Sequence, residues 1–247
     1  MWMYAWDRTR NGYPTWVLEQ PGMRAWIDEF PALGALTLTQ ERVPFRAARG
    51  LVWNQEYPGA DVMSGFLRHV LLTSRKFQEA LHDAEASIPA GGVVLNVRRG
   101  DYYSNPAVAR NYAMDYPYLL RMVRDVVLDD VKRPIIVVSD DLQWCRTALP
   151  ESLPGSDLLF PPAGVFGGLA LVATGATAIL SNSTFSYWGG YLNEEIHGPS
   201  AHVWVPRFHS RNSVDGVVWQ QSPNWKFLEN VTHEMSRDVS VHRSRDE

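Results

Sequence analysis

The spacing of the apolar residues changes near residue 90. Residues 61–87 carry Phe66, Val70 and Phe77 at intervals of four and seven, which predicts a helix that ends at the IPAGG segment. Residues 1–60 contain frequent proline and glycine with little sustained periodicity, and this is typical of loop-rich structure.

After residue 90, short apolar runs alternate with helical patterns. The predicted strands are 93–97, 135–139, 158–160, 177–180 and 202–206. The predicted helices are 115–129, 142–149, 165–175 and 183–196. Strands without polar alternation are buried on both faces, which indicates an α/β fold with a doubly wound parallel sheet. Ligands of such folds bind at the carboxyl ends of the strands.

Composition narrows the class of protein. A net charge of -4 over 247 residues, with lysine and arginine scattered along the chain, argues against nucleic acid as a partner. Because Cys145 is the sole cysteine, no internal disulfide can form. The sequence has no run of about eighteen apolar residues that could cross a membrane. We therefore expect a cytoplasmic protein, either free or peripheral to a membrane.

The first predicted strand end carries two adjacent arginines. The segment VVLNVRRGDYYSNP, residues 93–106, delivers Arg98 and Arg99 to the rim of the sheet, followed by Asp101. A guanidinium does not lose its proton, so its removal from water requires an anion as a partner. Neighbouring strand residues point to opposite faces, so we expect one arginine to face a ligand and the other to be held by acids or carbonyls. An equally weighted alternative is a surface salt bridge with Asp101.

The second strand end carries Ser139, Asp140 and Asp141 directly before a predicted helix. Helix capping alone would explain these residue types. The functional interpretation assigns one carboxylate to the ribose or base of a nucleotide. A third interpretation is a metal-binding acid pair, for which adjacent acids at a cap are weak support.

The third strand end carries Asn182, Ser183 and Thr184 at the start of another predicted helix. Capping is again sufficient by itself, but free amides and hydroxyls at a helix start also bind anions. Since all three ends lie at one edge of a parallel sheet, the combination predicts a site for a nucleoside diphosphate. The chain lacks a GxxxxGK[ST] loop and a clear GxGxxG motif, which argues against an ordinary NTPase and a dinucleotide-binding protein. Arginine would then stabilise the departing diphosphate, a role that Mg²⁺ has in other enzymes.

Three motifs resemble one known family. NVRRGDY, SDDLQW and NSTFSYWGGYLN are similar, in this order, to the signatures of the bacterial and eukaryotic α-1,2-fucosyltransferases, and the likeness extends over about residues 90 to 228. The resemblance implies an inverting GT-B type glycosyltransferase that transfers fucose from GDP-fucose to a glycan hydroxyl, a galactoside in α-1,2 linkage, without a metal or a further cofactor. Its partners would be the nucleotide sugar and the glycan acceptor.

The same resemblance assigns roles to residues. Arg98 or Arg99 would hold the β-phosphate, and Asp101 is the nearest candidate for a general base unless it only orients the arginines. The residues expected to bind substrate are Asn96, Ser139, Asp140, Asp141, Thr177, Asn182, Ser183, Thr184 and Phe185. No histidine shows the spacing of a metal ligand.

The chain also departs from the family pattern. It lacks a GGLGNQLFQYA-like first segment, and Asn96 and Thr177 stand where the family has histidines. We therefore expect a reduced or divergent acceptor-side region in residues 1–90, a donor-binding domain in 91–228 and a tail in 229–247. Two further hypotheses follow, namely a catalytically degenerate nucleotide-sugar-binding protein that works with a partner, and a metal-dependent transferase that uses Asp140 and Asp141.

Overall fold

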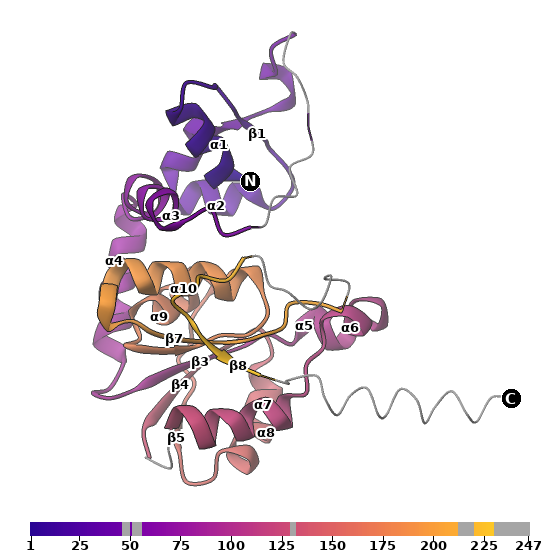
Figure 1. The fold of residues 1–247 in the computed structure, drawn as a ribbon, viewed down its shortest axis with the longest axis vertical. Coiled ribbons are helices and arrows are strands. Elements are labelled where there is room, and N and C mark those ends of the chain that lie inside the picture. The colour runs from indigo at the N-terminus through magenta and orange to yellow at the C-terminus, as the bar shows by residue number, and fades with distance from the viewer. Residues whose placement is uncertain (46–49, 51–55, 129–131, 212–219, 230–247) are drawn as a thin grey trace, which may run out of the picture. The chain divides into compact units, whose positions relative to one another are not determined.

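The computed structural model describes the chain except for residues 46–49, 51–55, 129–131, 212–219 and 230–247 (Figure 1). The described chain divides into two compact units, Met1–Asp83 and Ala84–Glu247. The acceptor-side and donor-side roles expected for residues 1–90 and 91–228 stay predictions. The predicted tail lies outside the described residues from position 230 onward.

The first unit has more helix than its proline and glycine content indicated. Its elements are α1 (Trp2–Arg10), β1 (Val17–Leu18), α2 (Met23–Glu29), a 3₁₀ segment (Pro31–Leu36), β2 (Thr37–Leu38), a 3₁₀ turn (Gln40–Arg42), α3 (Ala60–Phe66) and a π-helical turn (Leu67–Leu71). The strands β1 and β2 are parallel. Phe30 and Phe77 are fully buried, and their rings meet edge to face at 5.0 Å.

The prediction of one continuous helix over residues 61–87 was wrong. The chain leaves the helical path at Leu72 and begins a new helix, α4 (Arg75–Ser87), three residues later. The cause is Ser74, whose buried hydroxyl accepts a hydrogen bond from the amide of Phe77 at 3.3 Å and donates to the carbonyl of Glu29. Serine at a helix start competes with helix continuation in this way.

The second unit confirms the predicted α/β class. Its six strands are β3 (Val93–Val97), β4 (Pro134–Ser139), β5 (Asp157–Leu159), β6 (Thr177–Ile179), β7 (His202–Pro206) and β8 (Lys226–Leu228). They form one parallel sheet in the order β5-β4-β3-β6-β7-β8. The order reverses direction between β3 and β6, which is the position where doubly wound folds bind ligands. The short edge strand β8 was missed by the sequence analysis.

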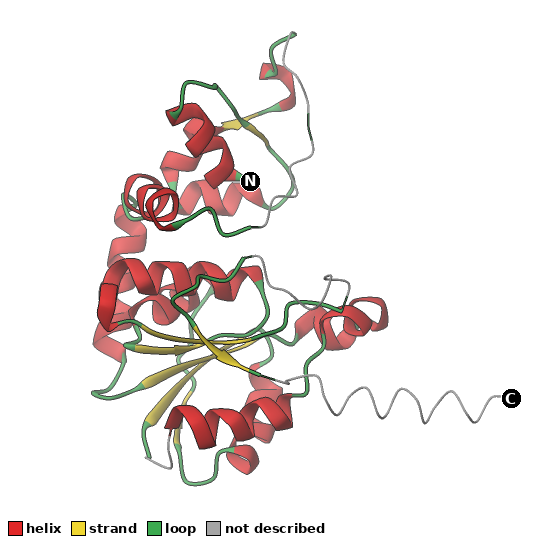
Figure 2. Cartoon of the chain, in the orientation of Figure 1, coloured by secondary structure: helices red, strands yellow, loops and turns green. Residues whose placement is uncertain are grey.

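Helices cover both faces of this sheet (Figures 1 and 2). One face carries α7 (Tyr116–Met122), its π-helical extension (Val123–Leu128) and α8 (Leu142–Ser152), and the other carries α9 (Val165–Thr174) and α10 (Thr184–His197). Alternate residues of β3 enter the core with α7 and α8, because Val93, Leu95 and Val97 belong to the same buried cluster as Leu119 and Leu149. The two helix layers pack on the sheet and so fix the positions of the strand ends at its carboxyl edge.

Two short helices at the carboxyl end of β3 were not predicted. They are α5 (Gly100–Ser104) and α6 (Pro106–Tyr112). Asn105 caps α6 by accepting a hydrogen bond from the amide of Ala107 at 3.0 Å, and Pro106 occupies the first helical position. An asparagine followed by proline is a recognised helix start, so the signal was present in the sequence.

Candidate functional site

Arg98 is the more exposed arginine of the pair. Its Nη2 lies 2.5 Å from Oδ1 of Asp101 and its Nη1 lies 2.7 Å from Oδ2 of Asp140. The hydroxyl of Tyr116 fixes the backbone of Arg98, accepting from its amide at 2.9 Å and donating to its carbonyl at 2.8 Å. The side chain is 35% exposed. The backbone of Arg98 is therefore fixed by Tyr116, while its guanidinium stays accessible at the edge of the sheet.

Arg99 is held by acid and aromatic groups. Its Nε lies 3.2 Å from Oδ2 of Asp141, and its guanidinium carbon lies 4.1 Å and 4.0 Å from the ring centroids of Tyr103 and Trp144. Its side chain is only 16% exposed. Arg98 pairs with Asp101, as the salt-bridge alternative expected, and also with Asp140. Arg99 is the less exposed arginine and is held by Asp141. A contact of either arginine with a ligand stays a prediction.

Asp140 joins the ends of β3 and β4. Its Oδ1 accepts a hydrogen bond from the amide of Arg99 at 2.8 Å, while Oδ2 pairs with Arg98. A Cβ atom at Gly100 would lie 2.3 Å from Asp140 Oδ2. A side chain at position 100 would therefore force the carboxylate of Asp140 to shift from its place beside Arg98.

Asp141 caps a helix, and Ser139 supports the turn that leads into it. Asp141 caps α8 by accepting from the amide of Trp144 at 3.1 Å, and its own amide donates to the hydroxyl of Ser139 at 2.9 Å. The capping interpretation is thus realised for Asp141 alone, and a contact of either residue with a nucleotide stays a prediction.

Asn96 is buried beneath the edge and is used internally. Its Nδ2 donates to the carbonyl of Val138 at 3.1 Å, and its Oδ1 accepts from the hydroxyl of Ser181 at 3.2 Å and from that of Ser186. Only 4% of the residue is exposed. Asn96 therefore ties β3 to β4 and to the start of α10. Its predicted role in substrate binding would be exerted through these neighbours.

The β6–α10 turn brings the third predicted group to the same edge. Ser183 caps α10 by accepting from the amide of Ser186 at 3.1 Å, and Asn182 is fully buried, with Nδ2 donating to the carbonyls of Tyr112 and His209 at 2.8 Å each. Thr184 is exposed at the first helical position. Phe185 is partly buried.

Thr177 is a correction to the predicted site. It is the first residue of β6 and pairs with Val93, the first residue of β3, and with His202, the first of β7. Since Val97 lies four residues beyond Val93, Thr177 is roughly 13 Å from the carboxyl edge. The structure does not bring Thr177 together with the other predicted residues, because a residue at the amino end of a parallel strand faces the opposite edge.

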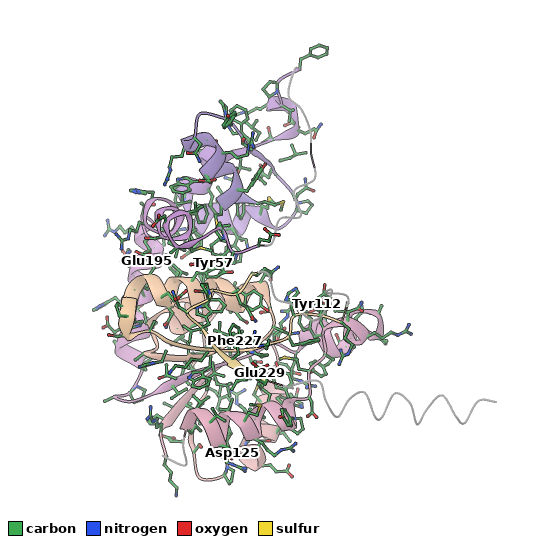
Figure 3. The ribbon with its side chains drawn as sticks, in the orientation of Figure 1. Tyr57, Tyr112, Asp125, Glu195, Phe227 and Glu229 are labelled. Atoms are coloured by element: carbon green, nitrogen blue, oxygen red, sulfur yellow. The ribbon has the colours of Figure 1, made fainter. Side chains whose placement is uncertain are left out.

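Sequence reasoning missed an aromatic row that runs along the edge from Arg98. The guanidinium carbon of Arg98 lies 5.2 Å from the ring of Tyr102, which stacks on Tyr112 at 5.0 Å, and Tyr112 meets the ring of His209 edge to face at 5.7 Å. Tyr112 is labelled on α6 in Figure 3. The hydroxyl of Tyr102 donates to the carbonyl of Asn182 at 3.4 Å. The only sequence signal was the YY pair after RRGD.

The tyrosines of this edge keep their protons and are poor acids. Burial raises the pKa of Tyr102 and that of Tyr103 to about 12. Burial also raises the pKa of Tyr187 and lowers the pKa of His209 below its ordinary value of 6.5. At neutral pH the tyrosines are therefore neutral phenols, and the imidazole of His209 is neutral as well.

The charges of the edge define what it can bind. Two guanidiniums face three carboxylates, those of Asp101, Asp140 and Asp141. An incoming anion would displace the most exposed of them, Asp101, whose side chain is 52% exposed. Within the described part of the chain, no cluster of three or more histidine, cysteine, aspartate or glutamate side chains could hold a metal ion.

The class of protein follows from comparison of this chain with known families. The model of glycosyl transferase family 11 matches residues 66–198, which include β3, the arginine pair, the β4–α8 turn and the whole of α10. The chain belongs to glycosyl transferase family 11, in agreement with the motif resemblance.

Individual relatives cover parts of the chain. The O-antigen biosynthesis glycosyltransferase WbnK of Escherichia coli is 32% identical over 108 residues, which are 40% of this chain and 33% of that protein. Crystal structures of POFUT1 in complex with GDP-fucose align with TM-scores of 0.43 at 14% and 15% identity, and cover 81% and 76% of this chain and 61% and 58% of theirs. The chain therefore spans about a third of the first relative and three fifths of the second. Among the described residues, no helix is long and apolar enough to cross a membrane.

Proposed function

We propose that the protein is a glycosyltransferase that transfers fucose from GDP-fucose to a glycan hydroxyl, a galactoside in α-1,2 linkage, with inversion and without a metal. The family and the relative WbnK support glycosyl transfer. The diphosphate would bind at the β3–β6 switch point, and Arg98 would neutralise the charge that develops on it as the sugar leaves.

One observation carries the proposal, namely the different settings of the two arginines. The guanidinium of Arg98 is accessible, and the carboxylate of Asp101 that pairs with it is itself exposed to solvent. A diphosphate can therefore take the place of Asp101, and Arg98 would still have an anionic partner. Arg99 is enclosed by Tyr103, Trp144 and Asp141 and supports the β3–α5 turn. Arginine contacts with phosphate are charge-assisted and directional, which suits Arg98 to this role.

The test is calorimetric titration with GDP, with ADP and UDP as controls, in EDTA. We expect binding that is selective for GDP and independent of metal, and a loss of GDP affinity of roughly tenfold or more in Arg98→Ala, because a charge-assisted phosphate contact contributes about 1.5–3 kcal/mol. Arg124→Ala is the matched control, since Arg124 also pairs with a carboxylate, Asp125 at 2.7 Å, on the helix layer below the sheet (Figure 3). Wild-type GDP affinity in Arg98→Ala would refute the assignment of the donor site.

A second candidate function is nucleotide-sugar binding without transfer. It is favoured by the internal use of Asn96, which stands where the family has a histidine and has its hydrogen bonds satisfied inside the protein. GDP binding together with no release of GDP from GDP-fucose, in the presence of galactoside acceptors, would favour this function. GDP binding that appears only when the titration is repeated with Mg²⁺ or Mn²⁺ in place of EDTA would instead favour the acid pair Asp140 and Asp141.

A further inference from the structure

Tyr102 lies on α5, directly beside the more exposed arginine of the candidate site. The guanidinium carbon of Arg98 lies 5.2 Å from the centroid of the Tyr102 ring, a distance at which a cation is attracted to an aromatic face. The phenol is neutral at pH 7, because burial raises the pKa of Tyr102 to about 12. The contact therefore joins a cation to a ring, and not a cation to a phenolate.

The ring of Tyr102 is itself held in place from two directions in the chain. Tyr112, at the end of α6, stacks on it with the ring centroids 5.0 Å apart and the ring planes at 27°. The hydroxyl of Tyr102 donates to the carbonyl of Asn182 at 3.4 Å, and Asn182 lies in the turn between β6 and α10. Tyr102 thus links the end of β3 to the turn that follows β6, across the switch point of the sheet.

The two tyrosines that follow RRGD are each paired with one arginine. Tyr102 lies four residues after Arg98, and Tyr103 lies four residues after Arg99 and contacts its guanidinium at 4.1 Å. Arg99 has a second ring, that of Trp144, on its guanidinium at 4.0 Å. The turn from β3 into α5 therefore places an aromatic ring on both guanidiniums, and Arg98 is the one that is left accessible.

Three groups determine the orientation of the Arg98 guanidinium. Nη1 pairs with Asp140 at 2.7 Å, Nη2 pairs with Asp101 at 2.5 Å, and the ring of Tyr102 lies against the guanidinium carbon. A diphosphate that takes the place of Asp101 would leave Asp140 and the ring as the contacts that fix the guanidinium. Because Asp140 holds a single nitrogen, the plane could turn about that contact, and the ring restricts this rotation.

A ligand would also strengthen the contact between Arg98 and the ring. The attraction of a cation to an aromatic face is larger where water is excluded. The side chain of Arg98 is 35% exposed, and a bound diphosphate would cover part of that surface. The contact should therefore be stronger in the bound state than in the free protein, so that it contributes to affinity as well as to orientation.

We propose that Tyr102 is a positioning residue for the donor, whose ring holds the guanidinium of Arg98 in the orientation that receives the diphosphate. This inference rests on the proposed function.

The first test compares ring variants of position 102 by calorimetric titration with GDP in EDTA. Tyr102→Phe keeps the ring and should bind GDP within roughly twofold of the wild type, while Tyr102→Leu should bind roughly threefold to tenfold more weakly. The control is Tyr118→Leu, because Tyr118 on α7 also contacts an arginine, Arg121, at 5.5 Å. Wild-type affinity in Tyr102→Leu would overturn the proposal. An equal loss in Tyr102→Phe would assign the effect to the hydroxyl and would overturn it as well.

The second test separates the electrostatics of the ring from its packing. Fluorinated phenylalanines at position 102 nearly keep the shape of the ring, while fluorine withdraws electron density from its face. The Kd for GDP should rise stepwise from phenylalanine to 4-fluorophenylalanine and to 3,4,5-trifluorophenylalanine. One Kd for all three rings would mean that residue 102 only fills space, and would overturn the proposal even if Tyr102→Leu folds poorly.

The third test asks whether Tyr102 acts through Arg98. Tyr102→Leu should weaken GDP binding in the wild-type background and have little further effect in Arg98→Ala, because the two residues are in contact and their effects are then not additive. An equal loss in both backgrounds would overturn the proposal. GDP binding that is lost in Arg98→Ala and kept in Tyr102→Leu would refute this inference alone. Absence of GDP binding in the wild-type protein would refute the proposed function and this inference with it.

Discussion

Oδ2 of Asp140 lies 2.7 Å from Nη1 of Arg98, at the switch point of the sheet. The other oxygen of the same carboxylate accepts from the amide of Arg99 at 2.8 Å, so one side chain directly after β4 fixes the backbone of Arg99 and the guanidinium of Arg98 at the end of β3. Asp101 contacts Arg98 from the exposed side. The two carboxylates that pair with Arg98 therefore differ in function: Asp140 fixes the turn, and Asp101 contacts the exposed side of the guanidinium. Substitution of each aspartate in turn distinguishes the two functions.

Asp140→Asn is expected to reduce stability and GDP affinity together. The amide presents a donor to Arg98 or to the amide of Arg99, which leaves one donor without its acceptor at a cost of about 1–2 kcal/mol. Thermal unfolding and calorimetry measure the two effects. Asp125→Asn, at an exposed ion pair, is the control that should change neither. An unchanged melting temperature in Asp140→Asn would show that this carboxylate does not fix the turn.

Asp101→Asn is expected to strengthen GDP binding by roughly threefold to tenfold, because it removes the exposed anion that competes for Arg98. Stability should change little, as is usual for a surface ion pair. Calorimetric titration at two salt concentrations measures the effect, which should shrink as salt screens the carboxylate. Weaker GDP binding in this variant would mean that Asp101 positions Arg98 instead of competing for it.

Gly100→Ala is expected to weaken GDP binding and to lower the unfolding free energy by about 1–3 kcal/mol, since the added methyl group would overlap the fixed carboxylate of Asp140. Gly167→Ala is a matched control, because a Cβ there meets Ala163 at 3.5 Å, an ordinary contact. Chemical denaturation of both variants tests the idea. Equal stability of Gly100→Ala and the wild type would show that Asp140 moves aside without cost.

The second unit was largely predictable because its strands are buried on both faces and lack polar alternation. The predicted ranges of β3 and β7 agree with the structure, and β3 is bounded by Gly92 and Arg98. The edge strand β8 (Lys226–Leu228) was missed, since a three-residue strand has too few positions to show a pattern. The break at Ser74 was missed because its cause is a long-range bond to Glu29.

The site residues that directly follow strands could be predicted from the sequence. Residues that contact one another only in the folded protein, and that come from segments far apart in the chain, could not. Arg98, Asp140 and Ser183 follow strands, and parallel pairing places them at one edge. His209 and Tyr112 meet only through folding, so no sequence spacing links them. Thr177 was placed from the family pattern rather than from its strand, and its position at the amino end of β6 corrects that.

Acidification is expected to destabilise the wild-type protein more than His209→Gln. Burial lowers the pKa of His209 below 6.5, so between the folded and unfolded pKa values the unfolded chain binds more protons and the unfolding free energy rises with pH. The contribution of His209 is therefore present above pH 6.5 and is lost as the pH falls through and below that value. Glutamine does not titrate, so its variant should show a shallower loss between about pH 7 and pH 5. Urea denaturation across this range measures the slopes, with His202→Gln as the control. Parallel slopes for His209→Gln and the wild type would mean that the imidazole is as free to protonate in the folded protein as in the unfolded chain, and the packing of Tyr112 and Tyr187 around it would then not be what keeps it neutral.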